Sequence, residues 1–109
     1  MAVVKRFDLY LVNIDEEETS KDAKNTRPCV VISPDEMNEN VRHVLIAPIS
    51  SGSAVYPMRI AVDILNSKRY IILDQIRTVD AGRLVKKIGE LDKPTQKITL
   101  DTLQEFFAE

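Results

Sequence analysis

The chain has 109 residues, of which 44% are hydrophobic and 29% are charged, a composition that suits one domain with an ordinary buried core. Its formal net charge is −2 and its isoelectric point is near 5.4, so any nucleic-acid site would have to come from local clustering of basic residues. One cysteine and one histidine exclude an internal disulfide framework and a structural zinc site built from the usual ligands. We expect a single domain over residues 1–109.

The N-terminal segment also limits where the protein can act. MAVVKRFDLYLV reaches its first acidic residue at Asp8 and lacks both the apolar segment and the small-residue cleavage site of a signal peptide. No apolar run approaches the roughly 18 residues of a membrane-spanning helix. These patterns predict a soluble, cytoplasmic protein.

The first half of the chain predicts three strands. Residues 7–14 alternate with a period of two, which indicates a strand with one face fully buried, whereas residues 15–26 are polar and charged and indicate a mobile surface loop. Residues 28–33 and 43–49 are short apolar runs rich in β-branched side chains and are predicted strands. Between them, DEMNEN at residues 35–40 indicates a turn.

The second half predicts two more strands and a helix. After a loop at residues 50–57, residues 58–64 alternate again, NSKR at residues 66–69 is a predicted turn, and residues 70–79 are the longest predicted strand. In the C-terminal segment, helical spacing relates four apolar residues, Ile98, Leu103, Phe106 and Phe107. Asp92 is the expected N-cap of this helix and Pro94 suits its first turn. Strands joined by short polar turns predict an antiparallel sheet curled into a small barrel with one helix across it.

Four segments, in order along the chain, resemble the MazF/PemK toxins of bacterial type II toxin–antitoxin systems. They are RFDLYLVNID at 6–15, TRPCVVIS at 26–33, VLIAPISS at 44–51 and LDQIRTVDAGRLVKKIGEL at 73–91. The resemblance implies a mainly β fold with α, namely a small SH3-like barrel of the CcdB/PemK type made of antiparallel strands, with a C-terminal helix. It also implies a metal-independent, sequence-selective endoribonuclease that cleaves single-stranded mRNA and needs no cofactor.

The sequence departs from the family pattern at three places. The family usually has a glycine where Phe7 stands, which we interpret as local repacking. Its first loop usually contains glycines and a Glu-Gln pair, and residues 15–26 contain neither, which questions any RNA contact made by that loop. The family's threonine after Pro-Ile is Ser50, which keeps the hydroxyl.

RNA can be cut without a metal because its own 2′-hydroxyl is a nucleophile beside the phosphate. By resemblance, Arg27 is the catalytic cation that binds phosphate oxygens, Ser50 orients the phosphate or the 2′-hydroxyl, and Asp74 is a secondary candidate for the base. The residue types alone leave other readings open: Arg27 paired with acids of the first loop, Ser50 as an ordinary turn serine, and Asp74 within a structural network beside Gln75 and Arg77.

The predicted RNA-binding residues outside the cut phosphate are Lys5, Arg6, Ser51, Tyr56 and Arg77. Arg59 and Arg69 are among the further basic candidates for RNA contact, and most of the basic candidates are interpreted as solvated charges. The family places RNA in a groove across a homodimer, and the acidic tail of a cognate antitoxin occupies the same groove. These are the expected partners.

Two residues with reactive side chains are interpreted as non-catalytic. His43 is a structural or surface histidine at a strand start, and Cys29 is a small buried residue. Two other functions stay open. One is a CcdB-like toxin that poisons DNA gyrase by binding, although that relative depends on a C-terminal tryptophan and this chain has no tryptophan. The other is a catalytically inactive relative.

Overall fold

The computed structural model describes residues 3–13, 26–51 and 59–108. Seven strands carry the fold: β1 (Asp8–Asn13), β2 (Thr26–Val31), β3 (His43–Ser50), β4 (Arg59–Ile64), β5 (Ser67–Ile72), β6 (Arg77–Asp80) and β7 (Leu84–Glu90). Two α-helices, α1 (Asp35–Asn40) and α2 (Lys93–Phe107), and two 3₁₀ turns, η2 (Leu73–Gln75) and η3 (Ala81–Arg83), complete the described elements.

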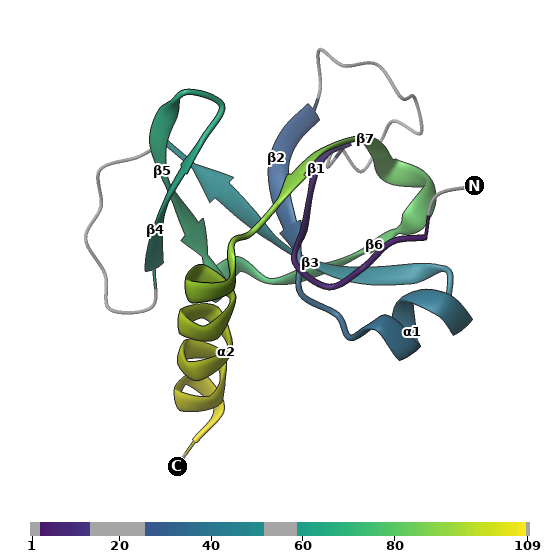
Figure 1. Cartoon of the computed structure of the whole chain (residues 1–109). Coiled ribbons are helices and arrows are strands. Elements are labelled where there is room, and N and C mark those ends of the chain that lie inside the picture. The colour runs from purple at the N-terminus through teal and green to yellow at the C-terminus, as the bar shows by residue number, and fades with distance from the viewer. Residues whose placement is uncertain (1–2, 14–25, 52–58, 109) are drawn as a thin grey trace.

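All the strand pairs are antiparallel, in the order β4-β5-β3-β2-β1-β7, and β6 pairs with β3 outside this path. The strand β3 is the centre of the sheet, because one edge pairs with β2 while the other pairs first with β6 and then with β5. Figure 1 shows how strongly the sheet curls, with α2 extending from it. The expected barrel-like β fold with a C-terminal helix is confirmed.

The predicted strand over residues 70–79 is wrong in the middle. It divides into β5 and β6, with η2 between them, because β3 offers different stretches of the same edge to these two strands. The chain has to leave the sheet to pass from one stretch to the other, and Leu73 in η2, 1% exposed, secures this step by packing into the core.

Three more local predictions need correction. DEMNEN forms α1 rather than a turn, because Pro34 supplies the extended N-cap backbone and Asp35 and Glu36 place negative charge in the first turn. The β4–β5 turn is Leu65–Asn66, with positive φ at both residues, so Ser67 already begins β5 and the predicted turn at 66–69 is displaced. The strand β7 was missing from the predicted elements.

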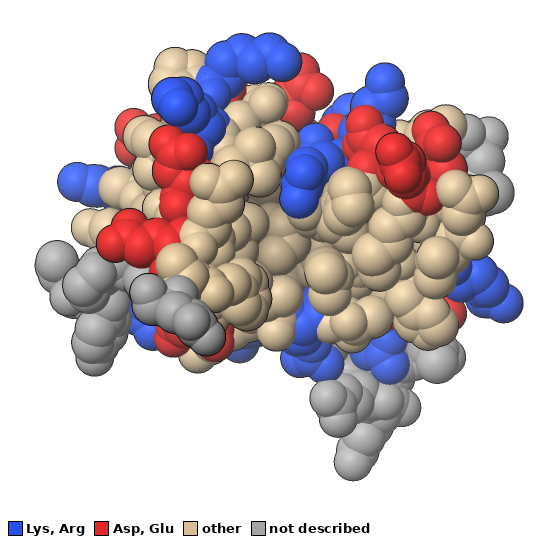
Figure 2. Space-filling view, turned by 90° about the horizontal axis from the view of Figure 1, so that it is seen from below, with Lys and Arg blue, Asp and Glu red and all other residues tan. Residues whose placement is uncertain are grey.

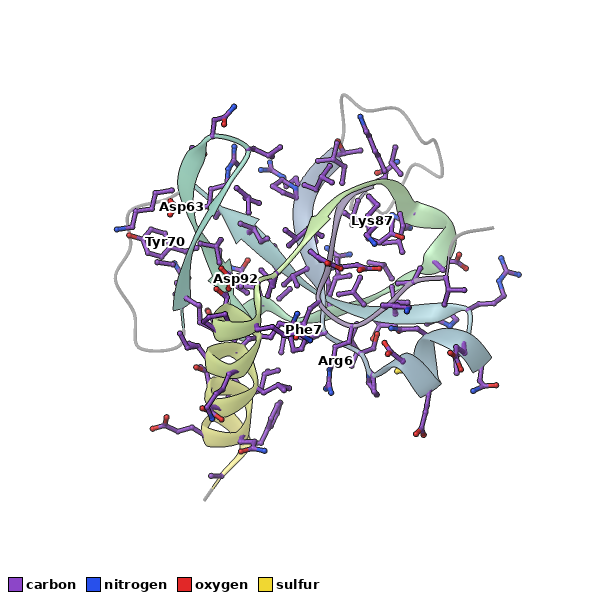
Figure 3. The ribbon with its side chains drawn as sticks, viewed as in Figure 1. Arg6, Phe7, Asp63, Tyr70, Lys87 and Asp92 are labelled. Carbon is purple, nitrogen blue, oxygen red and sulfur yellow. The ribbon has the colours of Figure 1, made fainter. Side chains whose placement is uncertain are left out.

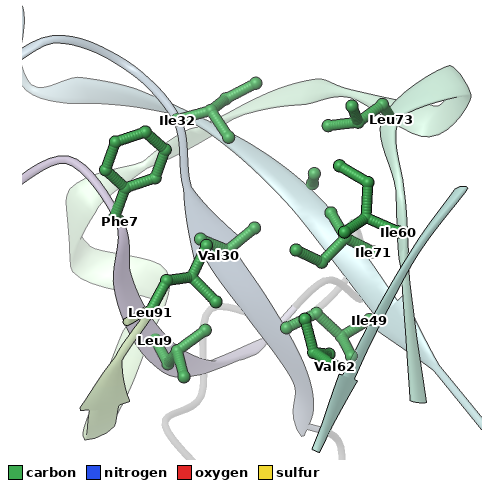
Figure 4. Close-up of a cluster of buried hydrophobic side chains, with 11 residues drawn as sticks. Phe7, Leu9, Val30, Ile32, Ile49, Ile60, Val62, Ile71, Leu73 and Leu91 are labelled. Carbon is green, nitrogen blue, oxygen red and sulfur yellow. The ribbon is translucent and has the colours of Figure 1, made fainter. Parts of the chain in front are cut away.

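Two hydrophobic clusters lie on the sheet. The larger one contains Leu9, Val30, Ile49, Ile71 and Leu73, and Figure 4 shows these side chains converging between β1, β2, β3 and β5. The second contains Tyr10, Val12, Cys29, Val31, Val44, Ile46 and Val79. The strand β1 contributes to both, so both of its faces are buried, not only one as predicted.

The helix α2 begins as expected, after the N-cap Asp92, but only some of its apolar residues pack against the sheet. Asp92 accepts a hydrogen bond from the Thr95 amide at 2.9 Å, and the hydrogen bonds from Thr95 lower the pKa of this N-cap carboxyl. Leu100 and Leu103 pack against the core. Ile98, Phe106 and Phe107, which share the helical spacing with Leu103, are 52%, 37% and 73% exposed. The helix projects beyond the sheet, so its last turn has no sheet beneath it (Figure 1).

Candidate active site

The strand register places the predicted catalytic side chains on one face of the sheet. Directly paired residues of antiparallel strands point to the same face, as do alternate residues along a strand. Cys29 pairs with Pro48, and Ile46 pairs with Arg77. Arg27, two residues before Cys29, therefore shares a face with Arg77 and with Ser50, two residues after Pro48.

The same face continues onto the β4–β5 hairpin. Ser50 pairs with Tyr70, and Ile72, two residues further along β5, pairs with Arg59. Arg59 therefore joins the face that carries Arg27 and Ser50. The ends or starts of five strands meet here, which brings together residues that are up to 50 positions apart in the sequence.

A pocket of about 590 Å³ opens at this meeting point. Its described lining is Arg27, Pro28, Ile46, Pro48, Ile49, Ser50, Ser51, Arg59, Arg69, Ile72, Gln75 and Arg77. Four arginines and no acidic residue occur in this lining, although the whole chain carries a net charge of −2. The local field is therefore strongly positive and suits an anionic ligand.

Figure 2 shows the charges on a single face of the molecule, seen from below relative to Figure 1. On this face, Lys and Arg side chains alternate with Asp and Glu around a broad uncharged area. No continuous positive stripe crosses this face. The cluster of arginines depends on the strand register rather than on composition, which is why net charge did not indicate it.

The pocket gathers four of the predicted site residues, namely Arg27, Ser50, Ser51 and Arg77. Asp74 is not among the described lining residues. It lies in η2 beside the pocket, where its Oδ1 is 3.5 Å from the Nε of Arg59. Tyr56 lies outside the described residues.

Lys5 and Arg6 lie in a different part of the molecule. They line a pocket of about 470 Å³ together with several acidic residues, among them Asp35 and Glu90. The Nε of Arg6 donates to the carbonyl of Ile32 at 2.9 Å, which holds the side chain against the barrel. In Figure 3, Arg6 and Phe7 are seen near α1, well apart from Tyr70, the cross-strand partner of Ser50. The structure does not bring these two basic residues to the arginine pocket.

Sequence reasoning undervalued Arg59, Arg69 and Gln75, which also line the pocket. Arg59 is not a solvated charge, since its side chain is only 18% exposed. The place of Arg59 in the pocket could have been predicted from the pairing of β4 with β5 across a two-residue turn. This pairing sets Arg59 opposite Ile72 and so next to Asp74 and Gln75.

Comparison with known proteins agrees with this geometry. Residues 5–107 match the family model described as PemK-like, MazF-like toxin of type II toxin-antitoxin system. The chain belongs to this toxin family. Endoribonuclease EndoA of Bacillus subtilis is 33% identical over 99 residues, covering 83% of this chain and 82% of the relative. Endoribonuclease MazF of Staphylococcus epidermidis is 30% identical over 97 residues, covering 84% and 80%.

The fold of this MazF-like toxin also matches solved structures. A MazE–MazF crystal structure from Deinococcus radiodurans superposes with a TM-score of 0.79 at 19% identity, covering 99% of this chain and 98% of that one. At this identity the likeness concerns the fold.

Two other residues of the MazF-like toxin behave as predicted. Cys29 is fully buried, and burial raises the pKa of its thiol to about 12, although the charges of Arg77 and Arg27 act in the opposite direction. This thiol is protonated at neutral pH and is not a nucleophile. His43 is exposed at the start of β3, whereas Ser50 is at its other end.

Within residues 3–13, 26–51 and 59–108, no group of three or more His, Cys, Asp or Glu side chains is arranged to hold a metal ion. Across the same part of the chain, no helix is long and apolar enough to cross a membrane.

Proposed function

We propose that this toxin is a metal-independent endoribonuclease that cleaves single-stranded mRNA at the arginine pocket. The supporting observation is the convergence of Arg27, Arg77 and Ser50 in a pocket whose described lining carries no acidic residue. A phosphodiester is an anion whose charge rises at the non-bridging oxygens during in-line attack, so preoriented guanidinium groups favour the transition state. The endoribonuclease names of the two curated relatives point to the same activity.

The reaction needs no external nucleophile. The 2′-oxygen attacks the adjacent phosphorus and forms a new P–O bond, while the bond from phosphorus to the 5′-oxygen breaks. The proton of the 2′-hydroxyl goes to a base, and the leaving oxygen takes up a proton. The products are a 2′,3′-cyclic phosphate, or its opened form, and a 5′-hydroxyl. In this scheme Arg27 binds the phosphate oxygens, and the hydroxyl of Ser50 orients the phosphate or the 2′-hydroxyl.

We also propose that the toxin is cytoplasmic, that residues 1–109 form a single domain, and that the toxin acts as a homodimer with a cognate antitoxin.

The pocket's four arginines would bind carboxylates as readily as phosphates, so an acidic antitoxin segment would compete with RNA for the same site. The solved MazE–MazF complex is consistent with such a partner.

The test is incubation of the purified protein with defined single-stranded RNA in excess chelator, followed by analysis of the fragment ends. We expect cyclic phosphate or its opened form at one end and 5′-hydroxyl at the other, and no cleavage of RNA whose 2′-hydroxyl is replaced by hydrogen at the cut site. Arg27→Ala should abolish cleavage. Arg42→Ala is the matched control, because Arg42 is an exposed arginine that pairs with Asp80 away from the pocket.

Intact RNA across diverse sequences would point to a catalytically inactive relative or to a CcdB-like binding toxin. Cleavage that disappears only when chelator is added would contradict the metal-free mechanism. An Arg27→Ala variant that cuts normally would contradict the proposed site.

A further inference from the structure

We infer that Asp74 is a positioning residue, which orients Arg59 toward an RNA phosphate in the arginine pocket, rather than the base of the reaction. This inference rests on the proposed function, because it assigns roles within the same pocket. It starts from the ion pair between Arg59 and Asp74, in which Nε and Oδ1 are 3.5 Å apart.

The strand register explains why these two residues meet. Arg59 begins β4 directly opposite Ile72, the last residue of β5. The chain then leaves the sheet through η2, so Asp74 comes two residues after the partner of Arg59. The hairpin thus fixes the backbone at both ends of the ion pair.

Burial differs between the two partners. The Arg59 side chain is 18% exposed and lines the pocket, whereas the Asp74 side chain is 44% exposed and is absent from the described lining. A largely buried guanidinium is costly unless a counter-charge accompanies it. Asp74 supplies that charge from beside the pocket, where its own negative charge does not enter the lining.

The atoms in contact favour an orienting role. A guanidinium is planar, with Nε near the stem and two Nη groups at the far end. The carboxylate lies 3.5 Å from Nε and makes no hydrogen bond to it, so its influence is charge attraction, which favours orientations of the plane that keep Nε near Asp74 and so biases the directions in which the Nη groups point. Preorganised donors bind a phosphate better than donors that must be ordered on binding. A general base, in contrast, has to reach the 2′-hydroxyl at hydrogen-bonding distance, about 2.6–3.2 Å.

Binding provides the first test, using an RNA with 2′-deoxyribose at the cut site, so that no cleavage occurs. Asp74→Ala should weaken binding several-fold, even though removing an acidic residue near a polyanion ordinarily strengthens it. Arg59→Lys should weaken binding to a similar extent, because lysine keeps the charge and loses the planar fork. Arg59→Gln should reduce the slope of log affinity against log salt by about 0.7, the value for one phosphate contact on a single strand.

Coupling between the two residues provides a second readout. If Asp74 acts only through Arg59, adding Asp74→Ala to Arg59→Gln should produce no further loss of binding. The matched control is Lys97 with Asp101, an exposed ion pair on α2, whose Lys97→Gln and Asp101→Ala variants should leave RNA affinity unchanged. Thermal unfolding of each variant identifies any that fail to fold, and Arg59→Lys and Asp74→Asn are the conservative alternatives.

Cleavage kinetics separate positioning from base catalysis. Asp74→Asn keeps an oxygen at the position that faces Arg59, so it should behave between wild type and Asp74→Ala, with a raised KM and an unchanged pH profile of kcat. If Asp74 were the general base, Asp74→Asn and Asp74→Ala should both lower kcat by about 10²–10⁴-fold and alter the pH profile of kcat.

Equal or tighter RNA binding by Asp74→Ala, or a loss of kcat in Asp74→Asn as large as in Asp74→Ala, would overturn the inference while leaving the proposed ribonuclease intact. A wild-type protein that binds the RNA without cutting it would remove the proposed activity, and the binding tests would still decide the role of Asp74. Absence of RNA binding by the wild type would contradict both proposals.

Discussion

Phe7 has a backbone conformation that suits a different residue type. Its φ is 74°, in the left-handed region that favours glycine. The ring is nevertheless 5% exposed and belongs to the larger core cluster, and the guanidinium of Arg6 lies 5.8 Å from its centroid. The structure therefore supports the interpretation of local repacking, in which a buried aromatic ring offsets an unfavourable backbone angle.

This conflict predicts an unusual order of stability among Phe7 variants. Phe7→Ala should lower the free energy of unfolding by about 3–5 kcal/mol through loss of the buried ring. Phe7→Gly should be more stable than Phe7→Ala by about 1 kcal/mol, because glycine adopts positive φ without the steric cost that alanine meets. Urea unfolding of both variants provides the measurement. A less stable glycine variant would show that the backbone at this position is not strained.

Sequence motifs indicated only some of the residues of the arginine pocket. Arg27 and Ser50 were found because each stands in a segment resembling the family. The ion pair of Asp74 with Arg59 could not be found, because it depends on the register of the β4–β5 hairpin. A turn at residues 66–69 would have placed Arg59 opposite Ile76 instead of Ile72. Lys5 and Arg6 lie apart from the arginine pocket, which the sequence did not indicate because charge alone does not say on which side of the barrel a residue lies.

The hairpin that carries this register has an unfavourable turn. Leu65 and Asn66 both have positive φ, at 51° and 59°, as a type I′ turn requires. Asparagine suits that conformation, but leucine does not, and Leu65 is 50% exposed, so little buried surface offsets the cost. The hydrophobic residue in the turn also explains why the sequence pattern placed the turn later.

Replacing Leu65 with asparagine should therefore stabilise the protein. We expect Leu65→Asn to raise the free energy of unfolding by about 0.5–1 kcal/mol, since asparagine tolerates positive φ at a lower cost. The control is Val41→Asn at a similarly exposed position with φ near −129°, where no gain is expected. Denaturant midpoints of the two variants measure the difference, and a Leu65→Asn variant no more stable than wild type would be evidence against turn strain.

Most elements were predictable, since alternation and helical spacing depend on local sequence. The exceptions depend on contacts between distant segments. Residues 70–79 are continuous and apolar enough for one strand. The break at η2 is required only because the two halves of this segment, β5 and β6, pair with two different stretches of β3. The helix α2 was located correctly, but which of its faces is buried depends on where the sheet ends.

For the whole molecule, charge distribution matters more than net charge. The four pocket arginines belong to a chain whose formal net charge is −2, and α2 contributes no residue to the described lining. At physiological ionic strength the field of an exposed charge is screened over about 8 Å. Acidic residues on α2 should therefore have little influence on RNA at the pocket.

We predict that Asp101→Asn combined with Glu105→Gln, which changes the net charge from −2 to 0 by removing two acidic residues, leaves RNA affinity nearly unchanged. The slope of log affinity against log salt should also stay constant, because it reports the phosphate contacts made. Binding titrations at several salt concentrations provide the comparison. A marked gain in affinity at physiological salt would show that α2 lies closer to the RNA path than the pocket lining indicates.

The pocket draws its four arginines and Ser50 from five strands, β2 to β6, none of which holds the site alone. A ribosome making this chain is itself translating the kind of molecule that we propose the finished protein cuts. Until Arg77 has left the ribosome and β6 has paired with β3, the nascent chain has no complete pocket. In the proposed function, damage to the message that encodes the chain is therefore delayed by the strand topology until β6 has been synthesised.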